Sequence, residues 1–239
     1  MTRVLLALLL PLVACTPEAP ATSTPDPQAP APTDSIAARL PVRQAGRALL
    51  AQHADPRDEW QQPGELIAFM GGDISGWTIA DLFADDGYFT FKLLDAGANV
   101  IAIVNDVEKY EALKARKEAA GLGDDRLVVR AVPTGDPGLT AGEADCALIV
   151  HAFPGIQDKK TFLRQLRNGL RRPSVLFMVE WQKRETPMGP PVAERMTPEE
   201  IMDQFLATGF TDLSAKSRTM PYDVMFMMTD PMEDYIDGE

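Results

Sequence analysis

The stretch that decides the fold is IADLFADDGYFTFKLL, residues 79–94. An apolar run over 78–83 predicts a strand, and the aromatic-rich run over 88–97, closed by Gly97, predicts a helix. Between them lies a short acidic turn whose single glycine is Gly87. Ligands of open α/β sheets bind beyond the carboxyl ends of the strands, so this turn is the first candidate for a ligand site.

Strands and helices continue to alternate after this turn. Helices are predicted at 108–121, at 159–170 and from Thr197, where TPEE has the form of a capping box with proline at the first helical position. Further strands are predicted at 100–104, 126–132, 144–150, 174–181, 211–217 and 222–229. Such alternation predicts an α/β domain with a doubly wound, mostly parallel sheet covered on both faces.

The first fourteen residues predict an export signal. Arg3 precedes an apolar run over 4–13 that is too short to cross a membrane, which takes about 20 apolar residues. The run ends in LVAC at 12–15, which resembles a bacterial lipobox and makes Cys15 the expected lipidated residue of the mature protein. The alternative is an ordinary signal peptide with a chance cysteine. Thr16, where an aspartate would favour the inner membrane, makes the outer membrane the expected location of this periplasmic lipoprotein.

Residues 15–35 form a proline-rich segment without large apolar side chains, and such a segment cannot build a core. We expect an extended tether, which at about 3 Å per residue reaches roughly 60 Å. The domain is then expected at 36–230, opening on a helical pattern at 36–52, and residues 231–239 are an acidic tail.

Composition narrows the partners. The formal net charge of −12 argues against binding to nucleic acid, whose phosphate backbone attracts basic proteins. Once Cys15 is acylated, Cys146 is the remaining thiol, and its place in the apolar run ADCALIV predicts a core residue. The expected partners are the membrane, through the lipid at Cys15, and an unknown small molecule or protein.

The order of elements, closing on a strand hairpin, resembles the class I S-adenosylmethionine-dependent methyltransferases. That resemblance implies a seven-stranded Rossmann-like sheet with an antiparallel last strand. The match is closer to exported bacterial methyltransferase-like proteins and covers roughly residues 55 to 229. It rests on four short motifs in order: RDEWQQP at 57–63, DGYFT at 86–90, DPGL at 136–139, and GPP at 189–191 ahead of a helix closing in ATGF at 207–210.

The departures from the family fall on its cofactor site. The family's first loop reads D-x-G-x-G-x-G, and here Asp81 and Gly87 remain while Phe83 and Asp85 replace the first two glycines. Because phenylalanine at a positive φ is strained, we expect the turn to follow another path. Asp85 also brings an anion to the expected place of the methionine carboxylate, which in a partly desolvated cleft costs on the order of 100-fold in affinity.

The second strand ends in Val104, where the family has an acidic residue that binds the ribose hydroxyls. Asn105 or Asp106 could substitute if the strand ends later, and Asp136 could meet the adenine edge. After the fourth strand, where exported relatives carry two histidines, His151 is the one present. If the cofactor site is retained, the resemblance assigns it to Asp81, Ala84, Asp86, Gly87, Asn105, Asp106 and Asp136.

These residues leave three hypotheses open. The favoured one is a degenerate, non-catalytic domain that works by binding or as a scaffold. The second is an active methyltransferase with a divergent loop, in which His151 is the general base. The third is a cation site built from Asp81, Asp85, Asp86 and Asp106, but adjacent aspartates in a turn are usually solvated, and no metal is expected.

Overall fold

The computed structural model describes residues 55–230, which form an α/β domain around a seven-stranded sheet. The strands are β1 (Thr78–Leu82), β2 (Asn99–Val104), β3 (Leu127–Ala131), β4 (Ala144–Val150), β5 (Leu170–Trp181), β6 (Asp212–Lys216) and β7 (Asp223–Asp230). The helices are α2 (Asp58–Gln61), α3 (Pro63–Phe69), α4 (Tyr88–Asp95), α5 (Val107–Ala119), α6 (Lys159–Gly169) and α7 (Pro198–Leu206), with short 3₁₀ turns at Phe153–Gly155 and Val192–Glu194.

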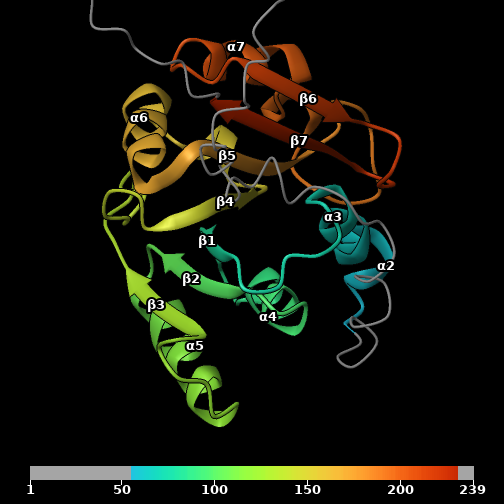
Figure 1. Ribbon diagram of the computed structural model, residues 1–239. Helices are drawn as coiled ribbons and strands as arrows, with labels where there is room; N and C mark the ends of the chain where they lie inside the picture. The colour runs from blue at the N-terminus through green and yellow to red at the C-terminus, as the bar shows by residue number, and fades with distance from the viewer. Residues whose placement is uncertain (1–54, 231–239) are drawn as a thin grey trace, which may run out of the picture. The chain divides into compact units, whose positions relative to one another are not determined.

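The spatial order of the strands is β3-β2-β1-β4-β5-β7-β6 (Figure 1). The first five strands in the chain are parallel, and β7 runs antiparallel between β5 and β6. The order reverses between β1 and β4, so the switch point lies at the carboxyl end of β1, where α/β sheets bind their ligands. The predicted sheet, including its antiparallel last strand, is confirmed.

Helices cover both faces of the sheet, as the alternating burial requires. Along β2, Val100, Ala102 and Val104 pack in one buried cluster with side chains of α3, α4 and α5. Ile101 and Ile103 point into the other cluster, which holds the apolar side chains of α6 and α7. Alternate residues of the central strands therefore pack into two cores, one on each face of the sheet.

The boundaries of the helices and strands follow the sequence signals. Thr197 caps α7 in the predicted capping box, and Asp106 caps α5 by accepting hydrogen bonds from the backbone of Glu108 and Lys109. Cys146 is fully buried, as expected. The short helices α2 and α3, which the sequence analysis did not predict, bring the RDEWQQP segment to the edge of the switch point.

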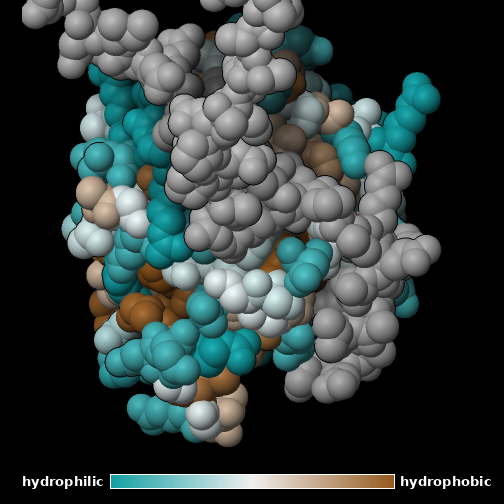
Figure 2. Space-filling model, viewed as in Figure 1, coloured by the Kyte–Doolittle hydropathy of each residue, from teal (hydrophilic) through white to brown (hydrophobic). Residues whose placement is uncertain are grey.

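The surface offers few apolar features. Among the coloured atoms in Figure 2, hydrophilic side chains predominate and hydrophobic ones occupy limited areas. The large hydrophobic side chains exposed among residues 55–230 are Val107, Met188 and Leu206, which lie on different segments. Within the same residues no helix is both long and apolar enough to span a membrane. The predicted signal peptide, Cys15, tether and acidic tail lie outside the described residues.

Candidate functional site

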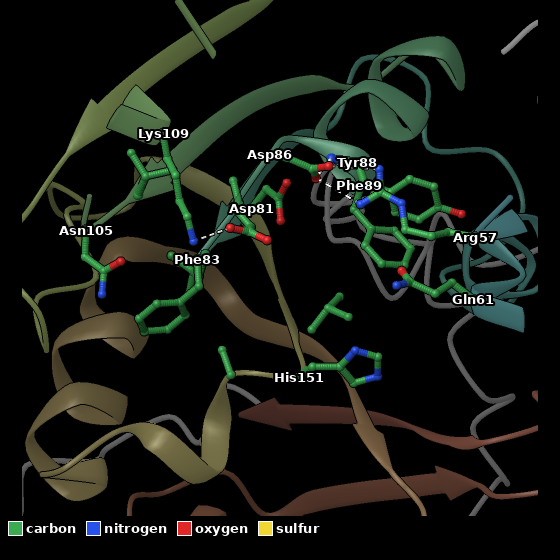
Figure 3. A pocket seen from close by; sticks show the side chains of 16 residues that line it. Arg57, Gln61, Asp81, Phe83, Asp86, Tyr88, Phe89, Asn105, Lys109 and His151 are labelled. Atoms are coloured by element: carbon green, nitrogen blue, oxygen red, sulfur yellow. Dashed lines mark hydrogen bonds and ion pairs between the residues drawn. The ribbon is translucent and has the colours of Figure 1, made fainter. Parts of the chain in front are cut away.

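A cavity of about 300 Å³ opens at the carboxyl ends of β1, β2 and β4 (Figure 3). Its walls come from six places: the loop after β1, the start of α4, the end of β2, Lys109 of α5, the end of β4, and the segment around α2. The side chains that line it are Arg57, Gln61, Asp81, Leu82, Phe83, Ala84, Asp85, Asp86, Tyr88, Phe89, Val104, Asn105, Lys109, Val150, His151 and Ala152.

The loop after β1 keeps the backbone path of a glycine-rich turn. Phe83, Asp85 and Gly87 have φ angles of 59°, 52° and 81°, all in the left-handed region. The expectation that phenylalanine would force another path is therefore wrong. Two hydrogen bonds fix the turn, from the Ala84 N–H to the Ile103 carbonyl at 2.9 Å and from the Gly87 N–H to the Ala84 carbonyl at 2.8 Å.

Packing offsets the strain at this turn. The ring of Phe83 stacks on Phe162 of α6, with the centroids 5.8 Å apart, so the left-handed conformation places an apolar ring against an apolar helix. Gly87 cannot be replaced in the same way. A Cβ there would lie 2.3 Å from Leu113 Cδ2, so both its φ and its surroundings require glycine.

The loop's two exposed carboxylates are neutralised by cations from other elements. Asp85 forms an ion pair with Lys109, which raises the pKa of Lys109. Asp86 pairs with Arg57, whose Nη2 lies 2.9 Å from Oδ2. Burial works to raise the pKa of Asp86, but the hydrogen bonds and charge of Arg57 outweigh it and lower that pKa. Asp85, which was expected to repel the methionine carboxylate of the cofactor, is thus already paired with Lys109.

Asp81 differs from its neighbours because it has no ion-pair partner among the described residues and is only 3 % exposed. Its Oδ2 accepts a 2.5 Å hydrogen bond from Thr90 Oγ1. Burial raises the pKa of Asp81 to about 7, since the low dielectric disfavours the charged form. Asp81 can therefore be either a neutral acid or an anion near neutral pH.

The end of β2 offers the cavity little polar chemistry. The buried side chain of Val104 lines it and cannot accept a hydrogen bond. Asp106, considered as a substitute, does not line it, because its carboxylate caps α5. Asn105 does line the cavity.

Asp136 lies apart from the main cavity. It borders a second hollow of about 10 Å³, together with Asn105 and the rings of Phe83 and Phe162. Its Oδ1 accepts from the Gly138 N–H at 2.7 Å, so its carboxylate is engaged in its own turn. A hollow of this size holds about one water molecule.

The four aspartates of the cation hypothesis do not converge. Asp85 and Asp86 pair with cations, Asp106 caps a helix and Asp81 binds Thr90. In the described part of the chain, no group of three or more His, Cys, Asp or Glu side chains is placed to hold a metal ion.

His151 lies in the wall of the cavity at the end of β4, and several contacts fix its position. It follows β4 with a φ of 54°, and its N–H donates to the Val179 carbonyl. Nε2 lies 2.9 Å from Oδ1 of Asp223, which is fully buried. The imidazole also stacks on Trp181, with centroids 4.2 Å apart, and lies nearly parallel to Trp60 at 6.1 Å.

This arrangement fixes the orientation of the imidazole. When Nε2 donates to Asp223, neutral imidazole presents Nδ1 as an acceptor or base. Glu180 of β5 lies close enough to Asp223 for the two negative charges to interact, and it is only 3 % exposed. Burial, with a smaller contribution from Asp223, raises the pKa of Glu180 to about 7, although the Phe153 N–H donates to it at 2.9 Å.

The segment after β5 supports Trp181 from behind. A Cβ on Gly189 would lie 2.8 Å from Trp181 Cδ2, so glycine lets the backbone approach the indole. Arg195, only 5 % exposed, donates to the carbonyls of Gln182, Arg184, Met188 and Pro190. The GPP motif therefore shapes the wall against which His151 stacks.

The sequence analysis did not identify several residues of this site: Arg57 as a loop partner, Gln61, Lys109, Glu180, Trp181 and Asp223. Two of them carry a signal in the sequence. Glu180 and Asp223 are carboxylates at the ends of the apolar runs VLFMV and VMFMM, where a charge needs a partner or a function. Pairing Asp223 with His151 required the fold, because 72 residues separate the two in the sequence.

Comparison with solved structures identifies the fold of this domain. No family model and no curated protein matches the chain. An S-adenosylmethionine-dependent methyltransferase structure from Aquifex aeolicus matches with a TM-score of 0.66 and 17% identity, over 77% of this chain and 98% of that one. The domain thus has the Rossmann-like methyltransferase fold.

Two other solved structures share the fold. The [4+2]-cyclase SpnF matches with a TM-score of 0.60 and 16% identity, over 76% of this chain and 86% of that one. A possible exported protein from Bordetella parapertussis matches with a TM-score of 0.56 and 14% identity, over 72% and 68%.

Proposed function

We propose that this protein is an extracytoplasmic lipoprotein, anchored through Cys15, whose methyltransferase-like domain no longer transfers methyl groups and instead binds a ligand in its cleft. The export signal, the lipobox-like LVAC and the proline-rich tether support the location. S-adenosylmethionine is a cytoplasmic metabolite, and an exported domain has no evident supply of it. One structure with this fold is described as a cyclase, so methyl transfer does not follow from the fold.

The small size of the hollow beside Phe83 is the main support for a loss of cofactor binding. On the side where the resemblance puts the adenine, the rings of Phe83 and Phe162 border a hollow of about 10 Å³, too small for a nucleobase. Beside it, Val104 cannot bind ribose hydroxyls, and Asp106 is engaged at the start of α5. The nucleoside half of S-adenosylmethionine therefore lacks space there, and Asn105 and Asp136 are the polar side chains beside the hollow.

Calorimetry with S-adenosylmethionine and S-adenosylhomocysteine tests this proposal. We expect no micromolar binding by the native protein. The combined variant Phe83→Gly, Asp85→Gly and Val104→Asp should gain binding, because it removes the ring and adds the acidic acceptor. A control variant with Val107→Asp in place of Val104→Asp puts the same charge on an exposed side chain and should bind less. Micromolar binding by the native protein would contradict the proposal.

A second candidate is an active methyltransferase with a divergent loop. The left-handed backbone at Phe83, Asp85 and Gly87 and the 300 Å³ cavity favour it, and His151 with Asp223 would supply the base. It predicts formation of S-adenosylhomocysteine when the protein is incubated with S-adenosylmethionine and an envelope extract. Loss of that product in Asp223→Asn would support this candidate over the first.

A further inference from the structure

The end of the cavity beside α2 holds two hydrogen-bond acceptors that have no partner among the described residues. Gln61 is 8 % exposed, and its Oε1 is buried without a hydrogen bond. His151 uses Nε2 on Asp223, which leaves Nδ1 unbonded. Figure 3 shows Gln61 and His151 on the same side of the cavity. A buried acceptor without a donor is rare in native proteins, so a bound donor is the natural explanation for Gln61 Oε1, and Nδ1 of the partly exposed His151 offers that donor a second acceptor.

The charges around the cavity disfavour an anionic ligand. Arg57 already donates to Asp55 and Asp86, and Lys109 pairs with Asp85. Both cations that line the cavity are thus occupied by carboxylates, and Asp81 adds a third carboxyl to the lining. An anion entering here would meet paired cations and additional negative charge, whereas a cation would meet acceptors.

The surfaces next to the two acceptors are aromatic. Tyr88 and Phe89 line the cavity, although Arg57 already lies over the Tyr88 ring at 4.2 Å. The rings of Trp60 and Trp181, which are not part of the lining, lie nearly parallel at 5.4 Å beside His151. Aromatic faces attract cations and pack well against flat apolar groups. A ligand that carries N–H donors on an apolar body therefore suits both components of this wall.

We infer that Gln61 and His151 bind the primary ammonium group of a small organic amine, with the apolar body of the amine against the aromatic side chains. This inference rests on the proposed function, since it assigns a ligand class to the same cleft. Two N–H bonds of one ammonium would reach Gln61 Oε1 and His151 Nδ1, and the third would remain for Asp81 or solvent.

A titration with matched probes tests this assignment. Benzylamine, as its ammonium ion, and benzoate are similar in size but opposite in charge. With the purified full-length protein at pH 7.5, ligand-observed NMR should give a millimolar Kd for benzylamine, as expected of so small a ligand, and no saturable binding of benzoate. Gln61→Leu should weaken benzylamine at least fivefold, and Gln157→Leu, an exposed glutamine in the same domain, should leave it unchanged.

The second variant tests the role of His151 Nδ1. In Asp223→Asn, the new amide can donate to Nε2, which moves the imidazole proton to Nδ1 and turns that atom from an acceptor into a donor. Benzylamine binding should fall at least fivefold, while the exposed substitution Asp203→Asn should have no effect. Circular dichroism melting of each variant confirms that the fold is retained.

Equal binding of benzylamine and benzoate, no binding of benzylamine, or native affinity in Gln61→Leu would overturn the assignment. A parallel titration with S-adenosylmethionine separates this result from the proposed function. If the protein binds S-adenosylmethionine with micromolar affinity and still prefers benzylamine to benzoate, the proposed loss of cofactor binding is contradicted and the amine site is supported. Failure of both ligands would overturn only the amine site.

Discussion

Lys109 of α5 forms an ion pair with Asp85, the residue at the second left-handed position of the loop after β1. A helix after the second strand thus neutralises a charge that the loop carries where the methyltransferases it resembles have glycine. The side chains remain 47 % and 63 % exposed, so the pair lies at the rim of the cavity. Its main consequence is for the charge of the cleft and not for the stability of the fold.

Lys109→Met should change stability by less than about 1 kcal/mol, because exposed ion pairs contribute little. It should tighten benzylamine binding about twofold to fivefold, since the variant leaves Asp85 unpaired beside the cavity. Urea unfolding and NMR titration measure the two effects. Lys114→Met on the same helix, where Lys114 does not line the cavity, is the matched control and should leave the affinity unchanged.

The raised pKa of Asp81 predicts a pH dependence of stability. The unfolded chain loses this proton near the ordinary value of 3.8, and the folded protein holds it until about pH 7. Between these values each pH unit lowers the free energy of unfolding by about 1.4 kcal/mol, and above them the loss is constant. The native protein should thus be less stable at pH 8 than at pH 5.

Asp81→Asn removes this contribution. The loss of stability between pH 5 and pH 8 should therefore be smaller in the variant than in the native protein, by roughly 1 to 3 kcal/mol. Glu180, with a pKa also raised to about 7 by burial, acts in the same window and keeps some of the slope. Urea unfolding at the two pH values tests this, with the exposed Asp212→Asn as control. An identical pH difference in Asp81→Asn and the native protein would count against a buried, protonated Asp81.

Gly189→Ala should destabilise the protein by about 2 to 4 kcal/mol and shift the tryptophan emission. Gly189 has a φ of 96°, and its new methyl would lie 2.8 Å from Trp181. Gly135→Ala is a closely matched control, because Gly135 has a φ of 92° with nothing within 4 Å of the added Cβ. It should cost only the backbone strain, about 1 to 2 kcal/mol. Equal costs for the two variants would mean that Trp181 moves freely.

Cys15→Ser tests the proposed anchor. The native protein should be found in the membrane fraction and take up labelled palmitate, whereas the variant should do neither, because one serine cannot be acylated as the lipobox cysteine is. Density-gradient separation of the two membranes then tests the expected outer-membrane location. Membrane association of the variant would argue against an anchor at Cys15.

The strands and most helices could be predicted because each carries a local signal. In β2 and β4 the apolar run is nearly continuous, as both faces of a parallel strand require, and Thr197 begins α7 with a capping box. Helices α2 and α3 escaped prediction because they are only four and seven residues long, and so short a segment shows little helical periodicity.

The site was harder to predict, because its properties depend on partners distant in the sequence. In the sequence Asp85 has no visible partner and His151 is an isolated histidine. In the fold Asp85 pairs with Lys109, and His151 pairs with Asp223 of β7. The path at Phe83 was predicted wrongly because intrinsic strain was weighed without the packing on Phe162. Local propensity is a weak guide where tertiary contacts determine the backbone.

The guanidinium of Arg195 binds four backbone carbonyls and forms no ion pair among the described residues. Neither an arginine nor a carbonyl changes its charge across the range in which Asp81 and Glu180 titrate. The wall behind Trp181 is therefore held by contacts that acid does not weaken. A shift from neutral to mildly acidic surroundings would alter the charge of Asp81 in the cleft while leaving the backbone contacts of Arg195 in place.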